Sequence, residues 1–267
     1  MIYVNPVPVE MATGNFYDRA GGEYLTPEKV ESDYAEVRFN RELKLFRAHC
    51  QGGSVLDVGC SSGGFLYQLN NRFPGEYKIL GTDVSTKPLD HAAKMGVPVV
   101  HGEFLSQSFD ERFDAVTFWA VMEHLLDPKA FLKKAVSVLK PGGLCFILTP
   151  NMDSLAVRLI GAKYRYIFPE HLNYFTAATM KRLVTEELAL VAMRSMHFNP
   201  LVIWQDFKSG EREVSRAERV ELLKRTTGYK RSPWMAPVKV AYGASEAVLG
   251  KMFLADNVVA VGRKARA

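Results

Sequence analysis

Apolar runs and amphipathic stretches alternate along this chain from about residue 50 onward. The apolar runs predict strands at 54–58, 78–82, 97–100, 113–118, 144–149, 190–197 and 257–262. Between them, apolar side chains recur at helical spacing and predict helices at 64–71, 87–95, 127–139 and from 176 onward. Because single strands alternate with single helices, the strands are expected to pair in parallel within one sheet.

The segment before residue 50 has its own amphipathic pattern. Phe39, Leu43, Phe46 and Cys50 sit at helical spacing among mostly charged residues and predict a helix over 33–50. A polar arm precedes this helix. We expect the helix to pack on the α/β unit that follows it.

The connection between the last two strands is longer than a hairpin requires. It is expected to hold a charged helix at 215–225 and an apolar helix at 234–254, which would cap a substrate cavity. The predicted division is an arm and helix at 1–50, a core at 51–200, an insertion at 201–254, and the last strand with a basic tail at 255–267.

Composition indicates a single large core and adds little about partners. The chain has 267 residues, 48% of them hydrophobic, which suits one α/β domain with additions. Its 34 basic and 29 acidic residues are spread along the chain, so the net charge of +5 is weak evidence for a polyanionic partner. No basic stripe with interleaved aromatic residues appears, and no nucleic-acid partner is expected.

Cysteine usage and hydropathy indicate a soluble cytoplasmic protein. The three cysteines are Cys50, Cys60 and Cys145; they lack Cys-x-x-Cys spacing, so neither a disulfide framework nor a metal site is expected. The N-terminus lacks the features of a signal peptide, and no apolar run reaches membrane-spanning length. The sequence does not predict the oligomeric state.

The strand at 54–58 breaks into a glycine-rich turn that leads into a helix. Residues 55–66 read Val-Leu-Asp-Val-Gly-Cys-Ser-Ser-Gly-Gly-Phe-Leu, with Asp57 near the end of the strand. Such a turn lets backbone N–H groups and a helix N-terminus approach a bound cofactor closely. A second acidic residue, Asp83, ends the next predicted strand. This arrangement indicates a site for an adenosyl cofactor.

These motifs, in this order, resemble those of class I S-adenosylmethionine-dependent methyltransferases. The resemblance rests on the glycine turn, Asp83, the segment 113–126 and the Lys-Pro-Gly-Gly run at 140–143. The segment 169–176, Pro-Glu-His-Leu-Asn-Tyr-Phe-Thr, resembles the subgroup related to ubiquinone-pathway O-methyltransferases and to tailoring methyltransferases. The resemblance implies a Rossmann-like sandwich with a mostly parallel seven-stranded sheet, an antiparallel last strand, an N-terminal helical arm and a helical insertion.

The resemblance also implies the cofactor, S-adenosyl-L-methionine, and its product, S-adenosyl-L-homocysteine. The turn residues Asp57, Gly59, Cys60 and Gly63 would line the methionine and ribose portions. Asp83 would accept hydrogen bonds from the two ribose hydroxyls, since a carboxylate offers paired acceptors to a diol. One departure is Ser61, which stands where the family often has glycine.

The remaining implied cofactor contacts come from three later segments. Val84 would touch the adenine, and Glu103, with its neighbour Phe104, stands where the family commonly has an aspartate facing the adenine amine. Trp119 and Ala120, just past the fourth strand, would lie beside the sulfonium. Trp119 could instead belong to the core, Asp57 could form an Asx turn or a helix cap, and Asp83 could be an ordinary aspartate at a strand end.

Methyl transfer from a sulfonium needs alignment, exclusion of water and, for a hydroxyl acceptor, removal of a proton. His171, in the loop beyond the fifth strand, is the first candidate base, and His124 is the second. For both, a structural role within the loop is the alternative. The residues that could line or gate the acceptor pocket are Tyr17, Tyr24, Arg38, Tyr164 and Tyr166.

Several function classes remain open at this point. The favoured one is O-methylation of a small molecule; N- or C-methylation of a small metabolite or sugar, methylation of a macromolecule, and a non-catalytic cofactor-binding subunit are alternatives. Residues 119–124 read Trp-Ala-Val-Met-Glu-His, unlike the Asn/Asp-Pro-Pro-Tyr/Phe run with which exocyclic-amine enzymes hold a flipped base. The glycine turn does not match the Gly-x-Gly-x-x-Gly fingerprint of dinucleotide-dependent oxidoreductases.

Overall fold

The computed structural model describes most of the chain. The described residues are 2–3, 7, 25–164, 166–167, 170–209, 218, 221–222, 225–226, 228–229, 232, 234 and 236–266. Tyr17 and Tyr24, two of the expected pocket residues, lie outside this set, as does most of the charged helix expected at 215–225. None of the helices in the described part of the chain is long and apolar enough to cross a membrane.

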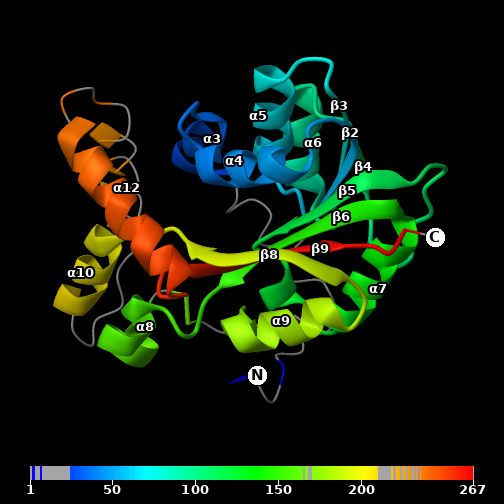
Figure 1. Cartoon of the computed structure of the whole chain (residues 1–267). Helices are drawn as coiled ribbons and strands as arrows, with labels where there is room; N and C mark the ends of the chain where they lie inside the picture. The colour runs from blue at the N-terminus through cyan, green and yellow to red at the C-terminus, as the bar shows by residue number, and fades with distance from the viewer. Residues whose placement is uncertain are drawn as a thin grey trace.

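A seven-stranded sheet forms the centre of the molecule, in the order β4-β3-β2-β5-β6-β9-β8 (Figure 1). The strands are β2 (Gly53–Val58), β3 (Tyr77–Asp83), β4 (Val99–His101), β5 (Phe113–Trp119), β6 (Leu139–Pro150), β8 (Ala189–Met196) and β9 (Asn257–Arg263). Only β9 runs against its neighbours in this sheet. The mostly parallel sheet with an antiparallel last strand is therefore confirmed.

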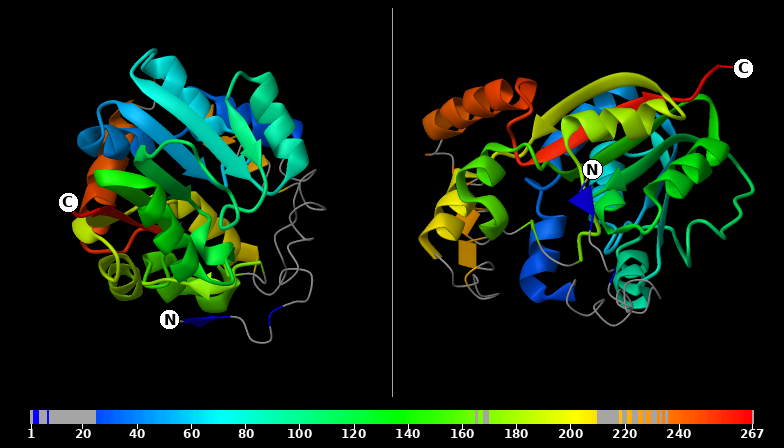
Figure 2. Two further views of the ribbon diagram at one scale, coloured as in Figure 1. Left: turned by 90° about the vertical axis from the view of Figure 1, so that its right-hand side faces the viewer. Right: turned by 90° about the horizontal axis from the view of Figure 1, so that it is seen from below.

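Helices cover both faces of the sheet, as Figures 1 and 2 show. The helices on one face are α4 (Asn40–His49), α5 (Gly64–Arg72) and α6 (Thr86–Lys94), and those on the other are α7 (Pro128–Val138) and α9 (Ala177–Thr185). Successive residues of one strand face opposite sides, so Val55 packs under α5 whereas Leu56 belongs to the cluster of α7 and α9. This double burial explains why the core strands read as continuous apolar runs.

The N-terminal helix is divided where the sequence pattern predicts one helix over 33–50. The structure has α3 (Pro27–Tyr34) and α4, separated by a short connection that ends at Phe39. Phe39 adopts a left-handed backbone conformation with φ 59°, which interrupts helical hydrogen bonding. The apolar spacing alone does not reveal this break, because Phe39 still packs against Phe65 and keeps its place on the apolar face.

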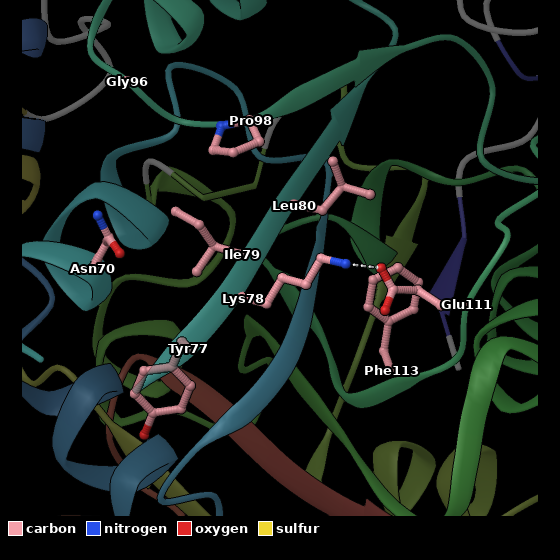
Figure 3. A pocket seen from close by; sticks show the side chains of 9 residues that line it. All are labelled: Asn70, Tyr77, Lys78, Ile79, Leu80, Gly96, Pro98, Glu111 and Phe113. Atoms are coloured by element: carbon pink, nitrogen blue, oxygen red, sulfur yellow. Dashed lines mark hydrogen bonds and ion pairs between the residues drawn. The ribbon is translucent and has the colours of Figure 1, made fainter. Parts of the chain in front are cut away.

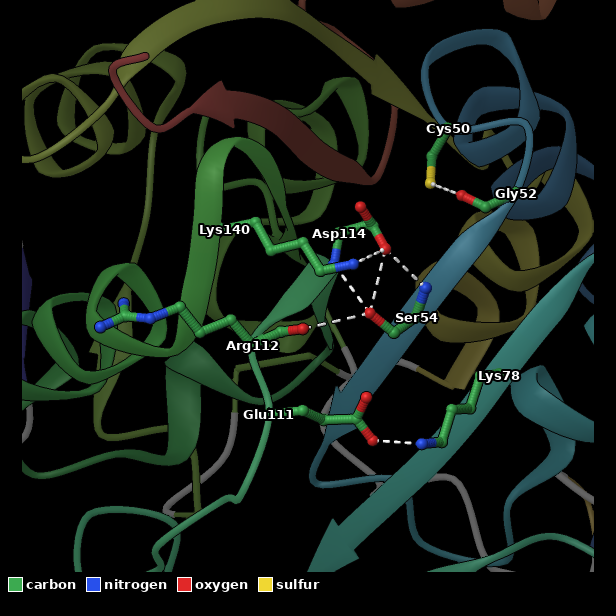
Figure 4. A network of polar contacts seen from close by, with 8 residues as sticks. All are labelled: Cys50, Gly52, Ser54, Lys78, Glu111, Arg112, Asp114 and Lys140. Atoms are coloured by element: carbon green, nitrogen blue, oxygen red, sulfur yellow. Dashed lines mark hydrogen bonds and ion pairs between the residues drawn. The ribbon is translucent and has the colours of Figure 1, made fainter. Parts of the chain in front are cut away.

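The Lys-Pro-Gly-Gly run at 140–143 lies within β6, at the amino end of the parallel strands. Lys140 pairs with Asp114 at 2.7 Å, and Asp114 also accepts hydrogen bonds from the backbone N–H of Ser54 at 2.8 Å and from its hydroxyl at 3.0 Å (Figure 4). These contacts tie the starts of β2, β5 and β6 together. The motif therefore serves the sheet, at the edge opposite the glycine turn.

Three helices gather where β6 ends and β9 begins (Figure 1). They are α8 (Leu155–Ile160), α10 (Pro200–Ser209) and α12 (Ala236–Lys251), with the short helix η3 (Gly161–Lys163) after α8. The sequence predicts α12 but not α10, which follows β8 almost directly. A two-stranded sheet of β1 (Ile2–Tyr3) and β7 (Asn173–Tyr174) lies apart from the main sheet.

A buried polar network joins α12 to the N-terminal helix α4. His197, after β8, places Nε2 2.9 Å from Oε1 of Glu42, and its backbone N–H donates to Glu246 of α12 at 2.7 Å. Glu246 also pairs with Arg41. Burial on its own would raise the pKa of Glu42, but the facing His197 and Arg38 bring it down to about 2. This network fixes the position of α12 relative to the core.

We predict that Glu42→Gln lowers the free energy of unfolding by about 2 kcal/mol at pH 6, because it leaves His197 without its buried carboxylate. A carboxyl group with a lower pKa in the folded state stabilises the fold above its unfolded pKa and loses this effect as the pH falls. The difference from wild type should therefore shrink from about pH 5 downward, as measured by urea unfolding. Exposed Glu36→Gln is the control; an equal loss in both variants, or a pH-independent difference, would contradict the assignment.

Candidate active site

The glycine turn links β2 to α5 in the conformation that its sequence predicts. Gly59 and Gly63 have positive φ of 70° and 76°, and a Cβ at Gly59 would lie 2.6 Å from Cγ2 of Val121. The N–H groups of Gly59 and Cys60 donate to the carbonyl of Thr82, which holds the turn against the end of β3. The turn thus lies at the carboxyl ends of β2 and β3, where ligands of open α/β sheets bind.

Ser61 takes a glycine-like conformation within this turn. Its φ is 51°, in the left-handed region that side chains other than Gly, Asn and Asp rarely occupy. Its Oγ is buried and lacks a hydrogen-bond partner among the described residues. The departure from the family's usual glycine therefore preserves the backbone path and adds a polar atom that requires a partner.

Asp83 ends β3 with its carboxylate directed at the glycine turn. One oxygen accepts from the backbone N–H of Ser61 and the other from that of Ser85, both at 2.9 Å. A carboxylate oxygen has two lone pairs, so each oxygen can accept one further hydrogen bond. Asp83 is half-buried, as a residue that positions the turn and also meets a diol would be.

The resemblance implies that Asp57 lines the cofactor, but the structure buries its side chain within the sheet. Its side chain is 3% exposed and accepts a 2.6 Å hydrogen bond from Thr117 Oγ1 on the neighbouring strand β5. Burial raises its pKa to about 7. The observed contact joins β2 to β5 beneath the turn.

The residues expected near the adenine differ in how deeply they are buried. Phe104 is 3% exposed and packs among Phe109, Phe118 and Phe131, so its side chain belongs to the hydrophobic core, whereas Glu103 is exposed. Val84 is half-buried just beyond Asp83. The assignments of these residues to the adenine stay predictions.

Trp119 ends β5 and Ala120 follows it, beside the first turn of α5. The Trp119 ring lies 5.0 Å from that of Phe65, and its buried Nε1 has no hydrogen-bond partner among the described residues. Ala120 has a positive φ of 58°, so the chain turns sharply at the carboxyl end of β5. A strained residue and a buried donor in need of a partner are features of a ligand site.

Helix α3 covers the glycine turn, a placement that the sequence pattern does not predict. Tyr34 donates its hydroxyl proton to the carbonyl of Ser62, and Ser62 Oγ donates to Asp33 Oδ2 at 3.3 Å. Arg38 lies 3.6 Å from Asp33, and its buried Nε lacks a hydrogen-bond partner among the described residues. The expectation that Arg38 lines the acceptor pocket stays a prediction; in the structure Arg38 lies beside Asp33, which accepts from Ser62 of the glycine turn.

Glu123, His124 and His171 converge on the far side of β5 from the glycine turn. One carboxylate oxygen or ring nitrogen from each lies within 4.8 Å of the others, and the imidazole ring centroids are 4.7 Å apart. Glu123 and His124 come from η2 (Met122–His124), directly after β5, and His171 precedes β7. A hydrogen bond from Asn173 to the carbonyl of Leu125 joins these two segments at 2.6 Å.

Backbone carbonyls orient both imidazole rings of this cluster. Nδ1 of His124 lies 2.9 Å from the carbonyl of Glu170, and Nδ1 of His171 lies 2.8 Å from that of Tyr166. A carbonyl can only accept, so Nδ1 carries the hydrogen in each ring and Nε2 is the accepting nitrogen. Burial lowers the pKa of His124 to about 4 and that of His171 to about 3, so both rings are neutral at pH 7.

Glu123 is the member of the cluster that is not among the candidate bases expected from the sequence. It is 1% exposed, and neither carboxylate oxygen has a hydrogen-bond partner among the described residues. Buried carboxylates without partners are rare, because desolvation is costly. The signal present in the sequence is an acidic residue in an otherwise apolar segment between Trp119 and His124.

A separate pocket of about 480 Å³ lies at the amino end of β3 (Figure 3). Its lining includes Asn70, Lys78 and Glu111. Lys78 and Glu111 form an ion pair with each other, which satisfies the charges of the lining. This pocket holds none of the predicted site residues and lies away from the carboxyl edge.

Comparison with known proteins supports the sequence resemblance. A family profile described as a methyltransferase domain matches residues 32–187. A ubiquinone biosynthesis O-methyltransferase of Caulobacter vibrioides is 30% identical over 193 residues, which covers 63% of this chain and 72% of that protein. The enzyme of the same name from Hahella chejuensis is 30% identical, with 68% and 83% of the two chains covered.

Solved structures share the fold at low sequence identity. A Thermotoga maritima methyltransferase, described as a possible histamine N-methyltransferase, matches with a TM-score of 0.59 and 19% identity over 94% of this chain and 99% of its own. The N-methyltransferase NodS of Bradyrhizobium japonicum, crystallised with S-adenosyl-L-homocysteine, matches with a TM-score of 0.55 and 15% identity over 94% of this chain and 98% of its own.

The sheet order, the glycine turn with Asp83 and the matching family profile all indicate the same protein family. The chain belongs to the class I S-adenosylmethionine-dependent methyltransferases.

Proposed function

We propose that this methyltransferase transfers the methyl group of S-adenosyl-L-methionine to a hydroxyl group of a small molecule. The observation that carries the proposal is the Glu123–His124–His171 cluster beside the carboxyl end of β5, because a buried imidazole can remove the proton that a hydroxyl acceptor loses. The curated relatives named O-methyltransferases support the same acceptor chemistry.

The cofactor would lie along the carboxyl ends of β2, β3 and β5. Asp83 would bind the ribose diol, and the turn from Gly59 to Gly63 would border the methionine portion. Buried polar atoms that lack partners among the described residues surround this path, namely Ser61 Oγ, Trp119 Nε1 and Arg38 Nε. Arg38 would bind the carboxylate of the methionine portion, since a guanidinium pairs with a carboxylate through two parallel hydrogen bonds.

The acceptor would lie between the imidazole pair and the helices beyond β6. His171 would accept the hydroxyl proton at Nε2 while the backbone carbonyl of Tyr166 holds Nδ1–H. Tyr164 and Tyr166 lie in the same segment, with Tyr164 buried and Tyr166 partly exposed. Helices α10 and α12 would cover the acceptor and exclude water from the transfer.

Asp83→Ala should weaken S-adenosyl-L-methionine binding about 100-fold, because it removes both acceptors from the ribose diol. Isothermal titration calorimetry measures this affinity without an acceptor. Asp83→Asn tests the charge separately, since it retains one acceptor oxygen. Glu111→Gln, which changes an exposed carboxylate away from the carboxyl edge of the sheet, is the matched control and should change the affinity by less than about threefold. Unchanged affinity in Asp83→Ala would contradict the ribose assignment.

His171→Ala should lower kcat for a hydroxyl acceptor by about 100-fold or more while the cofactor affinity stays within about twofold of wild type. An acceptor panel of phenols, catechols, sugars and primary amines, followed by mass spectrometry of the methylated product, identifies the acceptor class. Methylation of amines alone would contradict the hydroxyl assignment. A near-normal rate in His171→Ala with a hydroxyl acceptor would show that His171 is not the base and has a structural role.

A further inference from the structure

A groove lies between helix α4 and the edge of the main sheet that β9 and β8 form. Its volume is about 210 Å³, and its lining comes from these three elements alone. β8 is the last strand of the sheet and lies four strands away from β2, which carries the glycine turn. None of the residues assigned to the cofactor or to the acceptor lines this groove.

The floor of the groove is apolar. Ala192 of β8 lies opposite Val261 of β9; Val261 belongs to the hydrophobic cluster beneath α4, and Ala192 packs against that cluster. Val259, two residues before Val261, points to the same side of the sheet. Leu45 closes the floor from the helix. A ligand that fits this floor carries a compact apolar group.

Three basic side chains border this floor. Lys44 and His49 come from α4, and Arg194 comes from β8, where it lies opposite Val259. Lys44 and Arg194 are exposed. Within the part of the chain that the structure describes, no hydrogen bond or ion pair joins either of these two side chains to another residue. Their charges are therefore available to a ligand.

The positive groups around the groove act on one another. Burial, together with Arg263 of β9 and Arg194 of β8, lowers the pKa of His49. Burial also lowers the pKa of Arg41 in the same helix, and Arg194 adds to that effect. Like charges held on one surface raise the free energy of the protein, and a bound anion reverses this effect.

The chain does not supply this anion from the polar network beside the groove. Glu42 lies 2.9 Å from His197, and Glu246 pairs with Arg41. Neither carboxylate lines the groove, and no other acidic side chain does so among the described residues. The groove thus combines an apolar floor with cations that have no carboxylate partner there.

We propose that this groove binds a small organic phosphate, in which a phosphate monoester is attached to a compact apolar group. The guanidinium of Arg194 would bind two phosphate oxygens through parallel hydrogen bonds, and Lys44 would add a second positive charge. The imidazole of His49 would donate a further hydrogen bond. The apolar group would lie on Ala192 and Val261. The inference is independent of the methyl acceptor.

The charge and the size of the groove favour this ligand class. A phosphate monoester carries about −1.5 to −2 charges at pH 7 and three acceptor oxygens, which suits two fixed cations and an imidazole better than a carboxylate does. The volume of about 210 Å³ is below the range of about 300–1,000 Å³ that is typical of sites for drug-sized ligands. The apolar group should therefore be about the size of one ring.

The first experiment measures binding without methyl donor or acceptor, so its outcome is separate from that of the proposed function. Phenyl phosphate is titrated into the full chain by isothermal titration calorimetry at pH 8 and constant ionic strength. We expect a Kd of about 100 µM or tighter. Inorganic phosphate lacks the apolar group and phenol lacks the charge, so each should bind at least about tenfold more weakly. Absence of saturable binding, or equal affinity for phenyl phosphate and inorganic phosphate, overturns the proposal.

Variants test the two features of the groove separately. Arg194→Gln and Lys44→Gln should each weaken phenyl phosphate binding about tenfold. Ala48→Phe retains the cations but fills the groove from the exposed side of α4, and it should weaken binding by a similar factor. Lys181→Gln removes an exposed cation of α9 on the other face of the sheet and is the matched control. Unchanged affinity in Arg194→Gln, or an equal loss in Lys181→Gln, overturns the proposal.

His49 reports whether the phosphate enters the groove. Its Cε1–H resonance, assigned with His49→Asn, is followed by NMR as a function of pH with and without saturating phenyl phosphate. A bound anion favours the imidazolium, so it should raise the pKa of His49. Arg194→Gln should raise the pKa of His49 in the free protein, because it removes a positive neighbour. A titration of His49 that phenyl phosphate does not change overturns the proposal.

Two further measurements distinguish this groove from other sites for anions. Saturating S-adenosyl-L-homocysteine should leave the affinity for phenyl phosphate unchanged; competition would place phenyl phosphate in the cofactor site and overturn the proposal. Vesicles that contain phosphatidic acid present the same phosphate monoester on a lipid surface, and we expect no cosedimentation of the chain with them. Cosedimentation that Arg194→Gln abolishes would overturn the proposal in favour of a lipid surface.

Discussion

The register of β2 between β3 and β5 is the constraint on which the rest of this structure depends. Asp57 of β2 lies opposite Gly81 on one side and Thr117 on the other, so the three strands end together at one edge. The hydrogen bond from Thr117 to the buried Asp57 fixes this alignment from inside the sheet. A shift of one residue would exchange the faces to which Val55 and Leu56 point and would break the hydrogen bond between Thr117 and Asp57. It would also separate the glycine turn from Asp83.

Because these strands end at one edge of the sheet, a polar surface and a buried cluster of titratable side chains lie close together there. On the β2 and β3 side, backbone N–H groups, positive-φ residues and the carboxylate of Asp83 form a polar rim suited to an adenosyl group. On the far side of β5, two neutral imidazoles and a buried carboxyl group lie in a medium that penalises charge. The two environments meet at the carboxyl edge of the sheet, where β2, β3 and β5 end.

The sequence by itself determined the features that depend on local patterns. Alternating strands and helices, the positive-φ turn at Gly59 and Gly63, and a carboxylate at the end of the second core strand all follow from spacing and backbone preference. The helix break at Phe39 has no signal in the apolar pattern, because the residue keeps its apolar contacts while its backbone leaves the helical conformation. The placement of Arg38 beside the turn also depends on that break.

Only the tertiary structure decided which buried polar groups meet. Glu123 and His171 come from segments separated by α7, β6 and α8, and no local pattern encodes their distance. The directions of the two imidazole rings depend on the carbonyls of Tyr166 and Glu170, which become available only when the loop before β7 packs against η2. The sequence thus specified the glycine turn, because that turn is a local backbone structure. The cluster of Glu123, His124 and His171 required the fold, because its properties arise from long-range proximity and burial.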